Sequence, residues 1–187
     1  MSINKYKNYS LRLQNALQHS SWDKIDLLTN DLIECVIKRK NVYICGNGGS
    51  AANAIHIAND FIYGIAKKTG RGLKIQALSS NSAVITCLAN DVGYDSIFSE
   101  QLAVFGEASD ILIVLSGSGN SPNIIEVLNQ AKLMKIKSYA ILGYDGGKAK
   151  NIADELIHFD IDDMQIAEDL QLIVGHMIMQ TVYDNLK

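Results

Sequence analysis

Two glycine- and serine-rich segments of this 187-residue chain have the composition of phosphate-binding loops. They are residues 46–52 (GNGGSAA) and 116–122 (SGSGNSP). Glycines let the backbone approach a ligand closely, and the free N–H groups at the start of a following helix favour an anion. Ser121 as N-cap and Pro122 at the first helical position predict a helix start after the second segment, and the first helix is predicted to begin at or just after Ser50. Neither segment is charged, so together they favour a phosphate monoester held by neutral donors over two simple capped turns.

The sequence predicts that a parallel sheet positions these two loops. Five short apolar runs have strand length, at residues 42–45, 75–78, 111–115, 139–142 and 156–159, and helical patterns separate them. Apolar strands that alternate with helices predict a sheet covered on both faces. We therefore expect one domain over residues 1–187, an α/β three-layer sandwich with five parallel strands and extra helices at both ends, the last over about 164–185. Ligands of such sheets bind beyond the carboxyl ends of the strands, where both loops fall.

Composition and charge exclude several classes of protein. Apolar residues make up 48% of the chain, charged residues 20%, and the net charge is −3, which argues against general nucleic-acid binding. Cys35, Cys45 and Cys87 are too few and too far apart for a disulfide framework or a thiolate zinc site, and we expect buried free thiols. No apolar run has the length of a membrane span, and the first ten residues lack an apolar signal core. We expect a cytoplasmic protein with no membrane partner.

A nucleotide cofactor is the main alternative for the first loop. Gly46, Gly48 and Ala51 have the GxGxxA spacing of dinucleotide-binding folds. That fingerprint requires an acidic residue at the end of the second strand, where this chain has serines and an asparagine at 79–81. The Gly-Lys-Ser/Thr of a Walker loop is also absent. We therefore predict no nucleotide cofactor.

Three motifs together resemble the SIS (sugar isomerase) domain family, and within it the phosphoheptose isomerases. They are GNGGSAA after the first strand, Asn90-Asp91, and SGSGNS after the third strand. The resemblance extends over nearly the whole chain. It implies a homotetramer with active sites between subunits and an open-chain seven-carbon ketose phosphate as substrate. The substrate-binding residues that it implies are Asn47, Gly48, Gly49, Ser50, Asn90, Asp91, Ser116, Gly117, Ser118, Ser121 and Glu168.

The resemblance also implies a metal and catalytic set of four residues: His56, Asp60, Glu168 and His176. The family has Glu at the position of Asp60 and Gln at the position of Glu168, so both carboxylate positions depart from its pattern. His56 and Asp60 lie four apart on one helix face, and two imidazoles with two carboxylates suit zinc or a similar divalent ion. The alternatives are structural histidines and a solvated helix carboxylate at Asp60.

Aldose–ketose isomerisation gives these residues their expected roles. The reaction moves a proton between adjacent carbons through an enediol(ate), which requires a base and an acid. We expect Asp60 to be the base and His176 the acid, with Glu168 as the substitute base. The predicted reaction converts sedoheptulose 7-phosphate to D-glycero-D-manno-heptose 7-phosphate for surface polysaccharide. One alternative is an isomerase of another ketose phosphate. The other is a non-catalytic SIS protein that binds the replication initiator DnaA. Such a binding protein would have little use for the four polar residues.

Overall fold

The computed structural model describes residues 2–186, with the side chains of residues 2 and 68 excepted. The strands are β1 (Asn41–Gly46), β2 (Lys74–Ala77), β3 (Ile111–Ser116), β4 (Lys137–Leu142) and β5 (Glu155–His158). The helices are α1 (Ser2–Gln18), α2 (Trp22–Lys38), α3 (Gly48–Asn59), α4 (Ile65–Thr69), α5 (Ser82–Asp91), α6 (Ser99–Phe105), α7 (Pro122–Met134) and α8 (Met164–Asn185). A π-helical turn (Asp60–Gly64) joins α3 to α4, and short 3₁₀ turns lie at Tyr94–Ser96 and Ala149–Asn151.

The five strands form one sheet, and all four neighbouring pairs are parallel. The strand order is β2-β1-β3-β4-β5. From β1 the chain moves to one side of the sheet to form β2, then crosses back to place β3 on the other side of β1. The strand order therefore reverses between β1 and β3, and their carboxyl ends define the crevice where such sheets bind ligands.

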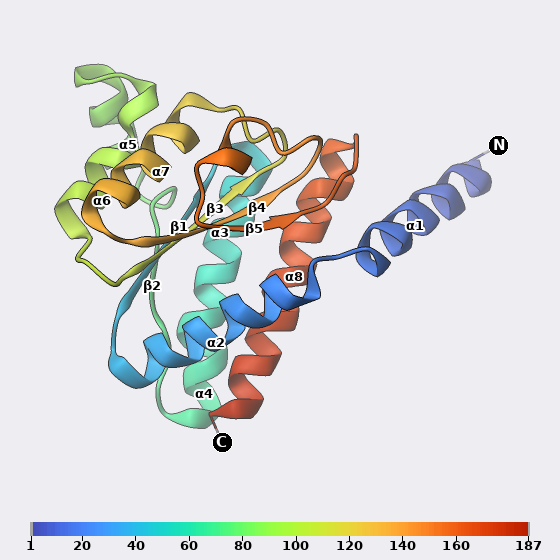
Figure 1. Ribbon diagram of the computed structural model, residues 1–187, viewed down its shortest axis with the longest axis horizontal. Helices are drawn as coiled ribbons and strands as arrows, with labels where there is room; N and C mark the ends of the chain where they lie inside the picture. The colour runs from blue at the N-terminus through green and yellow to red at the C-terminus, as the bar shows by residue number, and fades with distance from the viewer. Residues whose placement is uncertain (1, 187) are drawn as a thin grey trace.

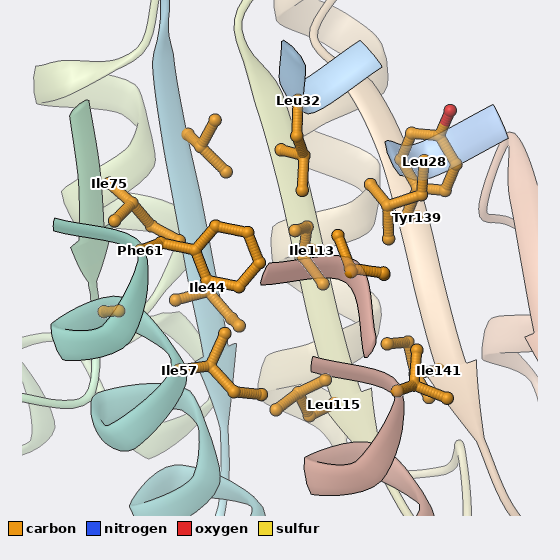
Figure 2. Packing of buried hydrophobic residues seen from close by; sticks show 14 of the residues in the cluster. Leu28, Leu32, Ile44, Ile57, Phe61, Ile75, Ile113, Leu115, Tyr139 and Ile141 are labelled. Atoms are coloured by element: carbon orange, nitrogen blue, oxygen red, sulfur yellow. The ribbon is translucent and has the colours of Figure 1, made fainter. Parts of the chain in front are cut away.

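Side chains that alternate along the strands build a core on each face of the sheet. Ile44, Ile113 and Ile141 point toward α2, α3 and α8, where they pack with residues such as Leu28 and Phe61 (Figure 2). The intervening strand residues pack on the other face against α6 and α7. Helices thus cover both faces (Figure 1), which is why the strands read as continuous apolar runs.

Helix α1 extends away from the rest of the molecule (Figure 1). Its carboxyl-terminal half packs beside α8, where Tyr9 donates to Asp169 and Arg12 pairs with Asp163 at 2.8 Å. Its other half leaves Ile3 and Tyr6 largely exposed. The helix is therefore attached to the domain at one end only, and its apolar residues there are open to solvent.

The predicted architecture is confirmed: each predicted strand lies within two residues of an observed one, and the last helix spans residues 164–185. Two details were wrong. Helix α3 begins at Gly48, two residues before the earliest predicted start, because its first turn already forms within the glycine segment. Cys87 is exposed, unlike Cys35 and Cys45, because α5 buries none of its side chains. None of the described helices combines the length and apolar character that crossing a membrane requires.

Candidate active site

The two predicted phosphate loops meet at the strand-order reversal. β1 ends at Gly46 and β3 at Ser116, and Gly46 is paired with Leu115 across the two strands. Between the loops lies a cavity of about 230 Å³, which we call the serine cavity. It is lined by Asn47, Gly48, Gly49, Ser50, Leu115, Ser116, Gly117, Ser118, Ser121, Met164 and Glu168. All of the loop residues that we expected at the substrate therefore lie together.

Hydrogen-bond donors in the serine cavity are left free by the local structure. Ser116 Oγ accepts from the Gly119 N–H at 3.0 Å, and Ser118 Oγ accepts from the Asn120 N–H at 3.3 Å. Each hydroxyl therefore keeps its own proton for a ligand. Ser121 is the N-cap of α7, but within the described chain its side chain makes no capping hydrogen bond. A capped turn alone does not explain this loop, whereas a phosphate bound by hydroxyl and N–H donors does.

Asn47 is held in place by residues that the sequence analysis missed. Its side chain exchanges two hydrogen bonds with Asn123, at 2.8 and 2.9 Å, and accepts a third from the Tyr94 hydroxyl at 3.1 Å. Asn123 is buried on the first turn of α7. The only signal for it in the sequence was a polar residue directly after Pro122, where the helix packs against the sheet. These contacts fix the Asn47 amide at the edge of the serine cavity.

Helices α3 and α8 lie side by side and run in the same direction (Figure 1). Gly49 lies against Glu168, and Ile57 lies against Gly175 further along the pair. A Cβ atom on Gly175 would lie 2.7 Å from Ile57 Cγ1, so the glycine permits this close approach. Between these contacts, Asn53 Nδ2 donates to the Glu168 carbonyl at 2.9 Å and to Gln171 Oε1 at 3.3 Å.

The close helix pair brings together three of the four residues of the predicted metal and catalytic set. Nε2 of His56 and Nε2 of His176 are 3.0 Å apart, and Asp60 Oδ2 lies 3.3 and 3.4 Å from them. We call these three residues the histidine group. Asp60 reaches both rings although it is one methylene shorter than Glu. The side chains of His56 and His176 are 49% and 42% exposed, so the histidine group lies on an open surface.

The histidine group has the donors and spacing of a divalent-cation site. Zinc binds imidazole nitrogen and carboxylate oxygen at about 2.0–2.2 Å, so two ligand atoms of a tetrahedral zinc are about 3.3 Å apart. The three separations in this group fall close to that value. Without a metal, the same contacts are a hydrogen bond between the two rings and two imidazole–carboxylate contacts. The residues present therefore fit a divalent ion.

Glu168 lies apart from the histidine group. It is eight residues before His176 on α8, which corresponds to about 12 Å along a helix. Its carboxylate lies against Gly49 at the start of α3, where a Cβ atom on residue 49 would collide with it. Of the described residues that line the serine cavity, Glu168 alone carries a formal charge, and none is Lys, Arg or His.

Asn90 and Asp91 are not among the described residues that line the serine cavity. They are the last two residues of α5, both are exposed, and Asn90 Nδ2 donates to Asp91 Oδ1 at 2.8 Å. Asp91 also accepts from the Cys87 thiol, which raises the pKa of that thiol. Tyr94, just beyond α5, is the residue of this region that reaches the site, through its hydrogen bond to Asn47.

The chain is similar to known proteins both in sequence and in fold. Residues 5–143 match the family model described as the SIS domain. A phosphoheptose isomerase of Helicobacter pylori (strain Shi470) is 34% identical over 151 residues, which cover 81% of this chain and 78% of the relative. The structure of a phosphoheptose isomerase from Francisella tularensis has a TM-score of 0.89 at 25% identity and covers 98% of this chain and 97% of its own. That of phosphoheptose isomerase from Neisseria gonorrhoeae has a TM-score of 0.86 at 27% identity and covers 97% and 96%.

Proposed function

The chain belongs to the SIS domain family, in the branch of the phosphoheptose isomerases, and on this basis we propose that it isomerises sedoheptulose 7-phosphate to D-glycero-D-manno-heptose 7-phosphate. The relatives' names supply the substrate class, and the site supplies the chemistry. An initiator-binding protein without catalysis would have no use for the histidine group, and we set that alternative aside.

One observation carries the proposal: the serine cavity and the histidine group lie at two points of the same helix pair. Gly49 and Glu168 mark the cavity end, and His56 and His176 mark the other end. The ends are separated by about two helical turns on each helix, roughly 10–12 Å. A substrate with a phosphate at one end and its reacting carbons several bonds away suits this separation. An open-chain ketose 7-phosphate has that form.

The histidine group can move the protons that the reaction requires. Asp60 takes a proton from C1. The electron pair of the broken C1–H bond forms the C1–C2 double bond, while His176 donates a proton to O2. The enediol then accepts the proton from Asp60 at C2, and O1 returns a proton to His176 as the C1 aldehyde forms. Both residues end in their starting protonation states. We assign Glu168 to the sugar rather than to proton transfer because it lies in the serine cavity.

We also propose that His56, Asp60 and His176 can hold a divalent cation such as zinc. An ion at Asp60 Oδ2 and at Nε2 of both rings would leave Asp60 Oδ1 and His176 Nδ1 as the atoms that transfer protons. Such an ion would act as a Lewis acid toward the oxygens of the sugar. The support is the donor set and the spacing of about one tetrahedral edge between the ligand atoms. Removal of metal with EDTA, followed by addition of zinc, tests this role separately from substrate binding.

A homotetramer with shared active sites is the assembly that we propose. Isomerisation through an enediolate benefits from exclusion of water, yet both rings of the histidine group are more than 40% exposed in one chain. Apolar residues close to the group in sequence are exposed, among them Ile55, Ile62 and Tyr63. Helix α1 projects and α5 buries none of its side chains, so both offer surface to other subunits. Light scattering on the purified protein gives the stoichiometry.

We place the enzyme in the cytoplasm, where phosphorylated sugars are made, and its product in the synthesis of surface polysaccharide. The first test is proton NMR of the purified protein with sedoheptulose 7-phosphate in D₂O, with zinc and with EDTA. We expect anomeric signals of the aldose and deuterium at C2. Binding of the sugar phosphate without any turnover would contradict the assigned reaction. It would leave a sugar-phosphate protein whose substrate is another ketose phosphate.

A further inference from the structure

The charge of the serine cavity has an unusual distribution for a site that takes a phosphate. The described residues that line it provide serine hydroxyls, backbone N–H groups and one amide, with Glu168 as the single charged side chain. No cation in that lining offsets a bound phosphate. A phosphate dianion in this cavity therefore shares a small volume with a carboxylate of the same sign.

Glu168 also lies close to the start of α3. Gly48, Gly49 and Ser50, the first residues of α3, line the serine cavity, and within the described chain the Asn47 side chain makes no capping hydrogen bond. The Glu168 carboxylate lies directly against Gly49, so a negatively charged side chain already lies beside this helix start. The phosphate would therefore bind at the opposite wall of the cavity, which is formed by Ser116, Ser118 and Ser121.

This arrangement divides the cavity into a phosphate wall and a carboxylate wall. A carboxylate accepts hydrogen bonds from sugar hydroxyls, which carry no charge. It repels a second anionic group on the same ligand, and in a partly enclosed site that repulsion is screened less than in water. We infer that Glu168 is a specificity residue that admits phosphates of neutral polyhydroxy chains and rejects compounds with a second anion near the phosphate, such as sugar-acid phosphates and bisphosphates. The inference rests on the proposed function, because it assumes that the serine loop binds the phosphate of a sugar.

The test uses pairs of ligands that differ only by a terminal CH₂OH or carboxylate. Erythritol 4-phosphate and 4-phosphoerythronate form the short pair, and glucitol 6-phosphate and 6-phosphogluconate form the long pair. Isothermal titration at pH 7.5 gives the Kd of each for the wild-type protein. We expect the polyol of the short pair to bind at least about tenfold more tightly than the acid. The preference should be smaller for the long pair, whose carboxylate is farther from the phosphate.

Three variants separate the charge of Glu168 from its shape and from the net charge of the protein. Glu168→Gln should reduce the preference in the short pair to within about threefold, because the amide no longer repels the acid. Glu168→Asp keeps the charge and should retain the preference. Asp162→Asn removes an exposed charge from the loop before α8 and should also retain it. Thermal melting of each variant confirms that it is folded. If Glu168→Gln does not fold, the wild-type comparison of polyol and acid still tests the inference, because equal binding overturns it.

The outcomes distinguish the inference from the proposed function. Equal binding of polyol and acid by the wild-type protein in both pairs overturns the inference, as does an undiminished preference in Glu168→Gln. If sedoheptulose 7-phosphate is turned over in either case, the proposed function stands and only the role of Glu168 fails. If no ligand of either pair binds and sedoheptulose 7-phosphate is not turned over, the proposed function fails, and the inference fails with it.

Discussion

The serine cavity and the histidine group lie on the same two helices, but they are built in different ways. The cavity is made by loops at the ends of buried strands, and its side chains are fixed by neighbours such as Asn123, which is buried beside Asn47. The histidine group rests on side chains of two helices whose distance depends on Gly175, and its rings are exposed. Under the proposed function, one chain therefore forms the phosphate-binding half of the site on its own. The histidine group, as the proposed chemical half, is exposed in one chain, and we expect its activity to depend on the proposed neighbouring subunit.

Loss of His176 gives the largest effect that this comparison predicts. In His176→Ala the acid is removed from the histidine group, while the serine cavity two turns away is untouched. We expect kcat to fall by about 10²–10⁴. The Kd for erythritol 4-phosphate should stay within about twofold, because the contacts of the phosphate are unchanged. A proportional loss of binding would show that the two regions are not separable.

Widening the gap between α3 and α8 should produce the next largest effect. In Gly175→Val the new side chain overlaps Ile57, whose Cγ1 would lie 2.7 Å from the added Cβ. We expect a destabilisation of about 1–3 kcal/mol and a fall in kcat of about 10², because His56 and His176 move apart. Urea denaturation and initial rates measure the two effects.

Gly64→Ala is the matched control for this change. Its added Cβ would lie 3.7 Å from Met179 Sδ, which is ordinary contact. We expect kcat and the denaturation midpoint to remain near the wild-type values. An equal loss in both variants would mean that the spacing at Gly175 is not what brings the rings together.

Removing one donor from the serine cavity should weaken binding and leave the chemistry intact. Ser121 makes no capping hydrogen bond within the described chain, so its hydroxyl is available to the phosphate. A hydrogen bond to a charged group contributes about 1.5–3 kcal/mol, so Ser121→Ala should raise KM about tenfold or more, with kcat within about twofold. Ser82→Ala, at the exposed start of α5, is the control. An unchanged KM in Ser121→Ala would remove this serine from the phosphate site.

The same contrast explains what the sequence could predict. The three central strands β1, β3 and β4 are buried along almost their whole length, so their apolar runs stood out, and strand order then placed the loops after β1 and β3 together. The three residues of the histidine group came from resemblance to a family, since spacing alone left structural alternatives open. Asn123, Met164 and Gly175 matter only through contacts between elements distant in sequence, and no local pattern marks such contacts.

Glu168 shows most clearly what residue spacing in the sequence cannot predict. Its spacing of eight residues from His176 allowed both to lie on one broad face of α8, and both do contact residues of α3. A spacing of two turns says nothing about which partner each side chain meets. Glu168 lies against the start of α3, and His176 lies against its end. The sequence identified the helix face, whereas the pairing with α3 decided which part of α3 each residue contacts.

The smallest expected effect concerns the amino-terminal end of α8, which lies at the serine cavity. Asp163 is the N-cap of α8, and its Oδ1 accepts from the Ile166 N–H at 3.2 Å. This backbone hydrogen bond, together with the contact to Arg12, holds the pKa of Asp163 below its ordinary value. The pKa of Asp163 is lowered in the folded state, so the cap stabilises the folded protein fully at pH values above the pKa of the unfolded chain, about 3.9. This stabilisation is lost as the pH falls through the pKa of Asp163 in the folded state.

Asp163→Ala tests this cap and completes the comparison. We expect a loss of about 1 kcal/mol in the free energy of unfolding at pH 7, and this loss should shrink as the pH falls through the folded pKa of Asp163. KM should rise slightly, because Met164 and Glu168, which line the cavity, lie in the first turns of α8. In contrast, kcat should remain unchanged, because His176 lies more than three turns from Asp163 along the same helix. Asp162→Ala, the exposed neighbour, is the control. A fall in kcat without a rise in KM would show that the start of α8 positions the histidine group as well, and the two halves of the site would then be mechanically coupled through this helix.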